Sequence, residues 1–539
     1  MSDNTKLVYG IDLGTTYSCV AQINEHNEPE VKRNKAGDSV TPSVVHIDGN
    51  KIIVGKDAKR KLNTDPEKTI AYIKREMSNN ESFKDTSRFP GRKNPVEISA
   101  EILKKLVKDV NEQYKQDIQD VVITCPAYFG SEARARTQKA GEEAGLNVLA
   151  IISEPTAAAI SYVKNIDEDQ VIMVYDLGGG TFDVSIIRFN DGAIEVIATG
   201  GDHKLGGADW DMRLAQELLD AYNEEHEESR KREGKTPIKL TLEGNDRLKN
   251  KLLIEVEETK KSLTDNDEAT AELQYDGVST SIEITRKRFD ELTEILLNRT
   301  IDIVEKTLKD AEKATGIKKD NIDKVLLVGG SSRMQQVKEK VEEVMSKKPE
   351  PSENPDQIVA EGAAIYAVRE KYFNILKQWE EDKKEGKADD SDKPQMPTIA
   401  GKTLGGSITN ITSKTYGMGC LAHDDKRLIV SNIIFKNTKL PAKMADSFFT
   451  IEDNQKAVSL NVYESNVTDK EKDRTIEIDA ANKLGKNRDD YLELTKDYPK
   501  GTEIIVEFEI NNNGILSVRA YVKNYPNDKV NFELAIEGI

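Results

Sequence analysis

Two short segments of this chain combine an aspartate at the end of an apolar run with glycines and hydroxyl side chains. They are Asp12-Leu13-Gly14-Thr15-Thr16-Tyr17-Ser18 and Asp176-Leu177-Gly178-Gly179-Gly180-Thr181-Phe182-Asp183. Glycine lets backbone N–H groups approach phosphate oxygens closely, and a carboxylate at each strand end can hold a hydrated Mg²⁺. Either segment alone is more simply interpreted as a turn that ends a strand. Together they predict two loops that clamp a triphosphate between two lobes.

A third glycine-rich segment strengthens this interpretation. Val325-Leu326-Leu327-Val328 is typical of a buried strand, and it leads into Gly329-Gly330-Ser331-Ser332-Arg333 at a predicted helix start. Other phosphate-binding motifs fit poorly. Gly401-Lys402-Thr403 is similar to the end of a P-loop, but Met396 stands where that motif needs its first glycine. No Gly-x-Gly-x-x-Gly follows a strand, so a dinucleotide-binding fold has little support.

The elements around these segments alternate in type up to about residue 371. Short apolar runs such as Val121-Val122-Ile123 and Val171-Ile172-Met173-Val174 are typical of strands, and longer stretches show helical spacing. One helix is predicted from residue 100 to about 117, with Ser99 as its N-cap. Alternating strands and helices predict an α/β domain over residues 1–370.

The composition changes beyond residue 370. Ten of the thirteen residues in 381–393 are charged, and prolines and glycines follow, so residues 371–409 are predicted to form a solvated linker. Alternating or β-branched runs then appear at 428–435, 458–462 and 504–510, and a turn at 511–514 leads into another such run. This pattern predicts an all-β domain over residues 410–539.

Bulk properties exclude several classes of function. The chain has 539 residues and a formal net charge of −18, which repels nucleic acid and anionic lipid, so neither is expected as a partner. There is no apolar run of about 18 residues, and the first apolar stretch is too short for a signal peptide, so a cytoplasmic location is expected. Cys19, Cys125 and Cys420 lie far apart and the five histidines are scattered, so neither a disulfide framework nor a zinc site is predicted.

Nearly all of residues 6–370 resembles the seventy-kilodalton heat-shock (DnaK-type) chaperones. The three glycine-rich segments occur in family order together with further motifs, which are Pro126-Ala127-Tyr128-Phe129, Glu154-Pro155-Thr156-Ala157-Ala158-Ala159, Leu205-Gly206-Gly207, Ile284-Thr285-Arg286, Asn354-Pro355-Asp356 and Gly362-Ala363-Ala364. The later part resembles the family through Lys436-Asn437-Thr438, Leu440-Pro441, Glu452-Asp453-Asn454-Gln455 and Asn513-Gly514-Ile515-Leu516. The resemblance implies a two-lobed, actin-like α/β ATPase domain followed by an all-β sandwich that binds peptide.

The resemblance also implies catalytic roles for individual residues. Asp12 and Asp176 would hold Mg²⁺ through water. Lys74 would lie against the γ-phosphate, where a cation offsets the charge that develops in the transition state. Glu154 and Asp183 would orient the attacking water or the metal shell. Without the resemblance, Lys74 would be interpreted as a surface lysine.

Further residues are implied to contact ATP or ADP on three sides. The phosphate loops would contribute Gly14, Thr15, Thr16, Tyr17, Gly178, Gly179, Gly180 and Thr181, with Thr181 also assigned to catalysis. One helix face would hold adenine and ribose through Glu257, Lys260, Lys261 and Thr264, although a solvated charged face is the simpler alternative for any single member. The pocket would be closed from the other side by Gly329, Gly330, Ser331, Arg333 and Asp356.

The implied function is that of a chaperone that binds extended apolar polypeptide and hydrolyses Mg²⁺-ATP slowly to control its release. J-domain and nucleotide-exchange co-chaperones are implied as partners. The alternative is a non-catalytic relative, a holdase or nucleotide-exchange factor, that binds ATP only structurally. Pro126 and Arg134 match positions that relay the nucleotide state to the second domain. Met418 and the strand Ile433-Ile434-Phe435 are candidates for the walls of a peptide pocket, with core packing as an equal alternative.

Two features depart from the family. Gly406-Ser407-Ile408-Thr409 stands where the family has an aliphatic interdomain linker, and this polar segment is not expected to dock as an apolar strand. Coupling between the domains is therefore expected to be weak. The only candidates for a substitute apolar surface are Tyr372, Phe373, Ile375, Leu376 and Trp379. The sequence ends at Ile539, where the family continues into a helical lid, so a lid is expected to be absent.

Overall fold

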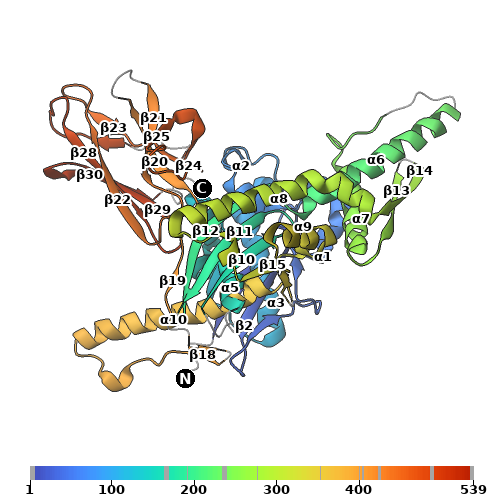
Figure 1. Cartoon of the computed structure of the whole chain (residues 1–539), viewed down its shortest axis with the longest axis horizontal. Coiled ribbons are helices and arrows are strands. Elements are labelled where there is room, and N and C mark those ends of the chain that lie inside the picture. Colours follow the sequence, from blue (N-terminus) through green and yellow to red (C-terminus); the bar gives the residue numbers. More distant parts are fainter. Residues whose placement is uncertain are drawn as a thin grey trace.

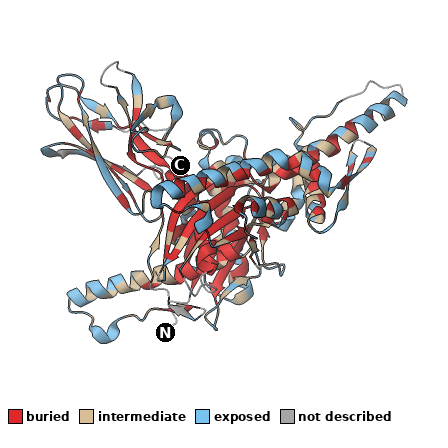
Figure 2. Ribbon diagram, in the orientation of Figure 1, coloured by how far each residue is buried: buried red, intermediate tan, exposed pale blue. Residues whose placement is uncertain are grey.

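Two lobes with central sheets and a β-rich unit at one side make up the molecule (Figure 1). The computed structural model describes residues 7–162, 169–190, 192–232, 239–275, 277–352, 354–399, 401–403, 406–422, 427–485 and 491–533. Buried residues are concentrated in the central sheets, whereas the projecting ends of two helices are largely exposed (Figure 2). These helices are α6 (Gly207–Arg232) and α10 (Ile358–Lys384).

A six-stranded sheet forms the centre of the first lobe. Its strands are β1 (Val8–Asp12), β2 (Tyr17–Ile23), β3 (Pro29–Lys32), β4 (Thr41–Pro42), β8 (Asp120–Cys125) and β9 (Asn147–Ser153). The order is β3-β2-β1-β8-β9, with β4 paired to β2. A smaller sheet contains β5 (Val45–Asp48), β6 (Lys51–Val54) and β7 (Thr69–Ile70). Because β1 and β8 run parallel, their carboxyl ends lie at the same edge of the sheet, which faces the cleft between the lobes.

Five α-helices and three 3-10 helices complete the first lobe. They are α1 (Lys56–Thr64), η2 (Pro66–Lys68), η3 (Ile73–Ser78), α2 (Glu81–Lys84), η4 (Pro90–Arg92), α3 (Pro95–Tyr114), α4 (Ser131–Glu143) and α5 (Glu154–Tyr162). The predicted start of α3 at residue 100 is wrong. Asn94 caps the helix, because its side chain accepts from the N–H of Glu97 at 3.0 Å while the Glu97 carboxylate accepts from the N–H of Asn94 at 2.8 Å. Ser99 is a buried interior position of the helix.

The second lobe is built on another six-stranded sheet, in the order β16-β15-β10-β11-β12-β19. Its strands are β10 (Gln170–Leu177), β11 (Phe182–Asn190), β12 (Ala193–Asp202), β15 (Lys324–Val328), β16 (Glu350–Pro351) and β19 (Ile408–Thr409), and a separate hairpin joins β13 (Glu268–Tyr275) to β14 (Val278–Thr285). Besides α6, the helices of this lobe are α7 (Asp246–Asp265), α8 (Arg286–Thr315), η6 (Lys319–Asn321), η7 (Gly330–Arg333) and α9 (Gln335–Met345). Helix α10 packs on β1, β2 and β8 of the first lobe.

Helices α5 and α10 cross between the two lobes at backbone distance. A Cβ atom on Gly362 of α10 would lie 1.7 Å from the carbonyl oxygen of Ala157 in α5. A Cβ atom on Gly10 of β1 would lie 2.1 Å from the backbone nitrogen of Ala364. No side chain fits at either position, so these glycines fix how closely the elements approach.

The C-terminal part is a β-sandwich, as expected. One sheet has the order β25-β21-β20-β24-β26 and the other β22-β28-β29-β30. The strands are β20 (Thr415–Leu421), β21 (Leu428–Ile434), β22 (Ala442–Phe449), β23 (Ala457–Ser459), β24 (Val462–Ser465), β25 (Thr475–Glu477), β26 (Asn482–Lys483), β27 (Tyr491–Glu493), β28 (Glu503–Ile510), β29 (Leu516–Val522) and β30 (Tyr525–Glu533), with one 3-10 helix, η9 (Ile478–Ala480). The run at 458–462 is divided between β23, which pairs with β27, and β24.

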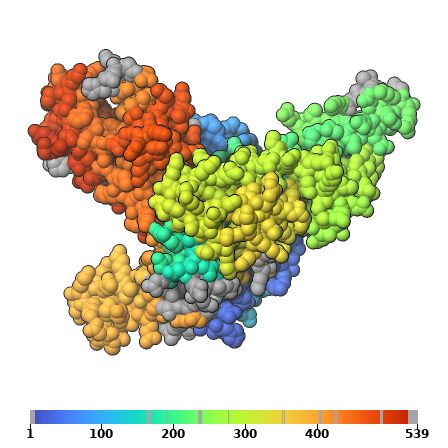
Figure 3. All heavy atoms as spheres, in the orientation of Figure 1, coloured from blue at the N-terminus to red at the C-terminus, as the bar shows by residue number. Residues whose placement is uncertain are grey.

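The segment between the two parts contains regular structure. Helix α10 continues as far as Lys384, and a short 3-10 helix, η8 (Asp390–Asp392), follows. A small hairpin then joins β17 (Thr398–Ile399) to β18 (Lys402–Thr403). Residues 371–399 form an arm that stands apart from the β-sandwich in Figure 3.

The expectation that Gly406-Ser407-Ile408-Thr409 cannot dock is wrong. Strand β19 pairs in parallel with β12, and the N–H of Ile194 donates to the carbonyl of Ser407 at 2.8 Å. The physical reason is that strand pairing uses backbone groups, which a polar sequence retains.

Candidate active site

A cavity of about 670 Å³ lies between the two lobes. All but two of the nucleotide-site residues predicted from the sequence line it. Those that line it are Asp12, Gly14, Thr15, Thr16, Tyr17, Lys74, Glu154, Asp176, Gly178, Gly179, Thr181, Glu257, Lys260, Lys261, Thr264, Gly329, Gly330, Ser331, Arg333 and Asp356. The exceptions are Gly180 and Asp183, which belong to the second phosphate loop but do not line the cavity. The folded chain thus brings together residues that are separated by more than three hundred positions.

The two phosphate loops approach each other so closely that neither Gly179 nor Gly180 could carry a side chain. A Cβ atom on Gly179 would lie 1.9 Å from Thr16 Oγ1, and one on Gly180 would lie 2.2 Å from Thr15 Cγ2. The carbonyl of Gly180 accepts from Arg75 Nε at 2.7 Å. The loops therefore need glycine at these positions, and they leave backbone groups free to approach a phosphate.

Lys74 lies among acidic side chains at the base of the cavity. It is buried in η3, and its ammonium group forms an ion pair with Glu154 at the start of α5. Asp12 Oδ1 accepts from Thr124 Oγ1 at 2.8 Å, and Asp183 Oδ1 accepts from the N–H of Tyr128 at 2.9 Å. Lys74 is therefore not the exposed surface lysine that the simpler interpretation predicted.

The acidic groups strongly perturb one another. Burial and the nearby Glu154 carboxylate raise the pKa of Asp12 to about 7 and that of Asp183 to about 8. The same two causes raise the pKa of Asp176 well above its usual value. Burial alone would lower the pKa of Lys74, but the carboxylates of Glu154 and Asp12 raise it overall. Together the carboxylates carry more negative charge than Lys74 offsets.

This donor set fits a divalent cation held through water. Carboxylate oxygens are the ligands that Mg²⁺ prefers, and a cation would offset the charge that raises these pKa values. Thr16 Oγ1 is buried, has no hydrogen-bond partner among the described residues, and faces the second loop. Among the residues that the structure describes, no group of three metal-binding side chains is placed to ligate an ion directly.

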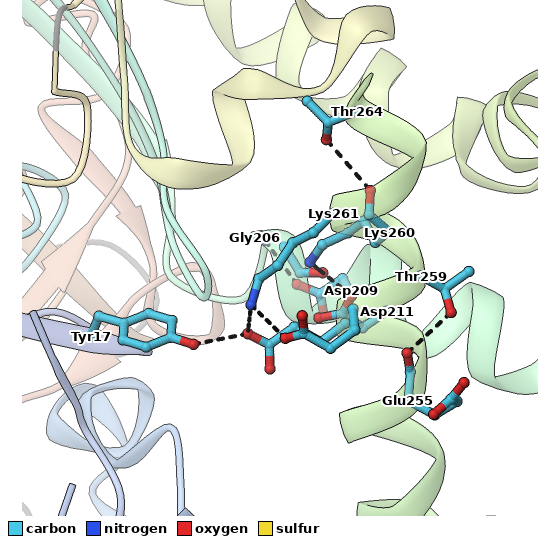
Figure 4. A network of polar contacts seen from close by, with 12 residues as sticks. Tyr17, Gly206, Asp209, Asp211, Glu255, Thr259, Lys260, Lys261 and Thr264 are labelled. Carbon is cyan, nitrogen blue, oxygen red and sulfur yellow. Dashed lines mark hydrogen bonds and ion pairs between the residues drawn. The ribbon is translucent and has the colours of Figure 1, made fainter. Parts of the chain in front are cut away.

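A network of polar contacts joins the two lobes at the mouth of the cavity (Figure 4). Tyr17 points across the cleft toward α7, and its hydroxyl donates to Glu257 Oε1 at 3.1 Å. Lys59 of α1 donates to Glu257 Oε2 at 2.6 Å, and Lys261 lies 2.9 Å from Glu257 Oε1. Burial would raise the pKa of Glu257, but Lys59 and Lys261 lower it to about 2. Glu257 thus joins the lobes through Tyr17 and Lys59 of the first lobe, while Lys261 of its own helix adds a second positive charge.

The sequence analysis missed several residues of this site, including four polar ones. Tyr72 and Asp211 line the cavity, Lys59 joins the network at its mouth, and Arg75 pairs with Asp209 at 2.6 Å while it supports Gly180. Asp211 follows the Gly206-Gly207 pair closely, which was an available signal. Lys59 lies on a strongly charged helix, and nothing in that helix distinguishes it from its neighbours.

Comparison with known proteins identifies the family. The family model described as Hsp70 protein matches residues 8–371 and 408–536. The proteins named chaperone protein DnaK from two strains of Halobacterium salinarum are each 35% identical to the chain over 520 residues, which is 95% of this chain and 72% of theirs. This chain belongs to the Hsp70 family. At the family level, its fold is an actin-like ATPase domain followed by a β-sandwich substrate domain, and its function is that of an ATP-dependent chaperone.

The β-sandwich of this Hsp70 chain packs against the first lobe through hydrogen bonds. The Tyr416 hydroxyl accepts from the N–H of Ser131 at 3.0 Å, and Ser131 Oγ accepts from the N–H of Leu516 at 2.7 Å. Arg134, expected to relay the nucleotide state, lies in this contact, because a Cβ atom on Gly514 would lie 2.8 Å from its Cδ. Pro126 is buried before α4.

Candidate walls of the peptide pocket are covered in this arrangement. Met418, Ile433, Ile434 and Phe435 are each at most 5% exposed, which is core packing. Instead, the large apolar side chains exposed on the sandwich include Leu421, Leu428, Phe449 and Ile451. Leu421 and Leu428 are directly paired across β20 and β21. Among the described helices of this Hsp70 chain, none combines the length and apolarity needed to cross a membrane.

Proposed function

We propose that this chain hydrolyses Mg²⁺-ATP slowly between its lobes and uses hydrolysis to control the release of extended apolar polypeptide from its β-sandwich. The observation that supports this most directly is the buried Lys74–Glu154 ion pair beneath two opposed glycine loops. A site that only holds a nucleotide does not need a buried cation at the base of the phosphate cleft. Residues 1–370 and 410–539 are proposed to act as the ATPase and peptide-binding domains.

In this proposal each group at the base of the cleft has one task. Asp12 and Asp176 would hold Mg²⁺ through water, and the ion would neutralise phosphate charge. Lys74 would stabilise charge that develops on the γ-phosphate, in the orientation set by its ion pair with Glu154. Glu154 and Asp183 would orient the attacking water, since a carboxylate oxygen can accept a hydrogen bond from it. Thr181 would contact the phosphate from the second loop.

Nucleotide specificity is proposed to come from the upper part of the cavity. Glu257, Lys260, Lys261 and Thr264 lie on one face of α7 and line the cavity, as their helical spacing predicted. Arg333 lies opposite and forms an ion pair with Asp356 at 3.0 Å. Adenine and ribose would bind between these two surfaces.

Extended apolar peptide is proposed to bind the β-sandwich near its exposed apolar side chains. Leu421, Leu428, Phe449 and Ile451 are between 40% and 59% exposed. A peptide that added main-chain hydrogen bonds beside them would bury these side chains. J-domain and nucleotide-exchange co-chaperones are the proposed partners, and the cytoplasm is the proposed location.

A single-turnover ATPase assay with and without an extended apolar peptide tests this proposal. The chain should hydrolyse prebound Mg²⁺-ATP slowly, and the peptide should change the rate. Binding of ATP with no hydrolysis under either condition would instead support the non-catalytic alternative. Leu428→Ser should weaken peptide binding and leave the rate without peptide unchanged.

A further inference from the structure

Strand β19 lies on the second-lobe sheet although it brings little apolar surface. Within 406–409 only Ile408 is large and apolar, and it is half-buried, while Ser407 is exposed. The pairing covers two residue pairs, Ile194 with Ile408 and Glu195 with Thr409. A two-residue pairing at the edge of a sheet contributes little net stability, because water competes for the same hydrogen bonds. Other contacts must therefore hold this segment.

Arg369 of α10 provides one such contact. Its Nη2 donates to the carbonyl of Gly406 at 3.2 Å, and its Nη1 donates to Glu370 at 2.9 Å. The guanidinium lies 4.6 Å from the centre of the Phe373 ring. A guanidinium that is stacked on a ring and paired with a carboxylate is already oriented before it donates, so little entropy is lost in making the bond.

Gly406 itself is confined against the second lobe. A Cβ atom at this position would lie 1.7 Å from the carbonyl oxygen of Gly192, in the turn before β12. Any side chain at position 406 would have to displace the segment from β12. The contact thus depends on glycine, and it adds no apolar side chain to the segment.

The arm formed by residues 371–399 folds back and returns the chain to the core just before this segment. Trp379 Nε1 donates to the carbonyl of Asp389 at 3.0 Å, and Lys383 and Lys393 lie 5.0 Å and 5.7 Å from the centre of its ring. Ile399, 4% exposed, then packs in the same apolar cluster as helices α5 and α10. The family model matches residues 8–371 and 408–536, so nearly the whole arm lies outside the match.

We propose that Arg369 and the arm 371–399 form an intramolecular clamp that keeps the interdomain segment paired with β12. Arg369 acts as a positioning residue, because it holds the Gly406 carbonyl and touches neither nucleotide nor peptide. The buried Ile399 fixes the chain immediately before the segment. The clamp takes the place of apolar side chains that the segment lacks. It concerns docking alone, so it can fail while the proposed chaperone function stands.

Hydrogen exchange of the Ile194 amide in the full chain measures docking directly, since this amide donates to Ser407. Arg369→Met keeps the aliphatic stem and removes the donor. Because a hydrogen bond from a charged donor is lost, protection of Ile194 should fall about tenfold. Gly406→Ala should lower it at least as much. Lys377→Met, at an exposed position of the same helix, should leave it unchanged.

Protection of the central strand β10 reports whether each variant remains folded. Unchanged Ile194 protection in both Arg369→Met and Gly406→Ala, with β10 intact, would overturn the clamp. Trp379→Ala tests the arm separately and lies away from β12. The clamp requires Ile194 protection to fall in this variant also, and full protection there would overturn the part assigned to the arm. ATP hydrolysis, measured on the same samples, tests the proposed function independently.

Discussion

The nucleotide cleft and the docked interdomain segment both join distant parts of the chain, but they do so by different means. In the cleft, charged side chains meet directly, as in the Lys74–Glu154 ion pair. In the segment, backbone groups of β19 and β12 pair, and a single arginine holds one carbonyl. The family resemblance therefore placed Lys74 in the cleft, whereas the polar composition of the segment gave no sign of its docking. A contact between side chains depends on residue types, which a sequence motif can carry, whereas strand pairing between backbone groups depends on the geometry of the folded chain.

The largest expected effect tests the side-chain half of this comparison. Lys74→Ala should lower ATP hydrolysis by about a hundredfold or more, because the lost charge matters most in the transition state. Nucleotide affinity should change by only a few-fold. Single-turnover rates and calorimetric titration with ATP measure the two quantities, with Lys84→Ala as an exposed-lysine control. A loss of affinity as steep as the loss of rate would make Lys74 a binding residue.

The two aspartates at the strand ends should show the next largest effect. Asp12→Asn or Asp176→Asn should slow Mg²⁺-dependent hydrolysis by roughly tenfold or more, since each removes a carboxylate from the proposed metal shell. The Mg²⁺ concentration needed for half-maximal rate should rise in parallel. Hydrolysis that is unchanged in both variants would refute the assignment of these residues to the metal.

The network at the mouth of the cleft should control release of nucleotide. Lys59→Ala removes one of the two lysines that face Glu257, so the dissociation rate of ADP should rise by up to about tenfold. Stopped-flow measurement with a fluorescent ADP derivative detects this change. Lys61→Ala, at an exposed position of the same helix, is the matched control. Equal release rates in the two variants would show that the lobes are held together elsewhere.

The smallest expected effect concerns pH and the packed domains. Burial lowers the pKa of Lys414 and of Lys436 to about 8. Glu464 and Asp202 partly oppose the shift of Lys414, Asp310 opposes that of Lys436, and Lys306 reinforces both. In water a lysine titrates near pH 10.4. Between these values the packed state binds fewer protons than the separated state, so packing should strengthen as pH rises from about 8 toward 10 and weaken as it falls.

Protection of the Ser131 amide, which donates to Tyr416 across the two domains, measures this dependence. After correction for intrinsic exchange, protection should increase between pH 8 and pH 9.5. Lys414→Met should flatten the increase, because it removes one of the titrating groups. An increase of the same size in Lys414→Met would assign the pH dependence to other residues.

The α/β part, the all-β part and the glycine loops were predictable from local patterns, whereas the roles of the other cleft residues came from the family resemblance. The predicted start of α3 is wrong, although Asn94-Pro95 followed by Glu97 is a capping pattern that was available. The apolar periodicity from residue 100 onward predicts Ser99 as the cap instead. The cap that forms is the one whose two hydrogen bonds satisfy the backbone N–H groups of Asn94 and Glu97.

Other features could not be predicted from local patterns. Lys59 meets Glu257 only because α1 and α7 approach across the cleft. The docking of β19 was missed because apolar side chains were counted, whereas backbone pairing, the fit of Gly406 and the donor on Arg369 are properties of the folded chain. Among the described residues of the arm, the most deeply buried apolar side chain is that of Ile399, six residues after the charged stretch ends at Lys393.

Because α10 is held where it crosses α5, a rotation between the lobes would displace residues of α10 in proportion to their distance from the crossing. Helix α10 packs on β1, β2 and β8 of the first lobe, so it turns with that lobe. From Gly362, where it crosses α5, to Lys384 the helix extends about 33 Å, and Arg369 lies about 10 Å from Gly362. A turn of about 15° between the lobes would swing the far end by about 9 Å and move Arg369 by about 3 Å. That smaller displacement is enough to separate Arg369 from Gly406, which pairs with the other lobe. Opening of the cleft would thus break the hydrogen bond from Arg369 to Gly406 and weaken the pairing of β19 with β12.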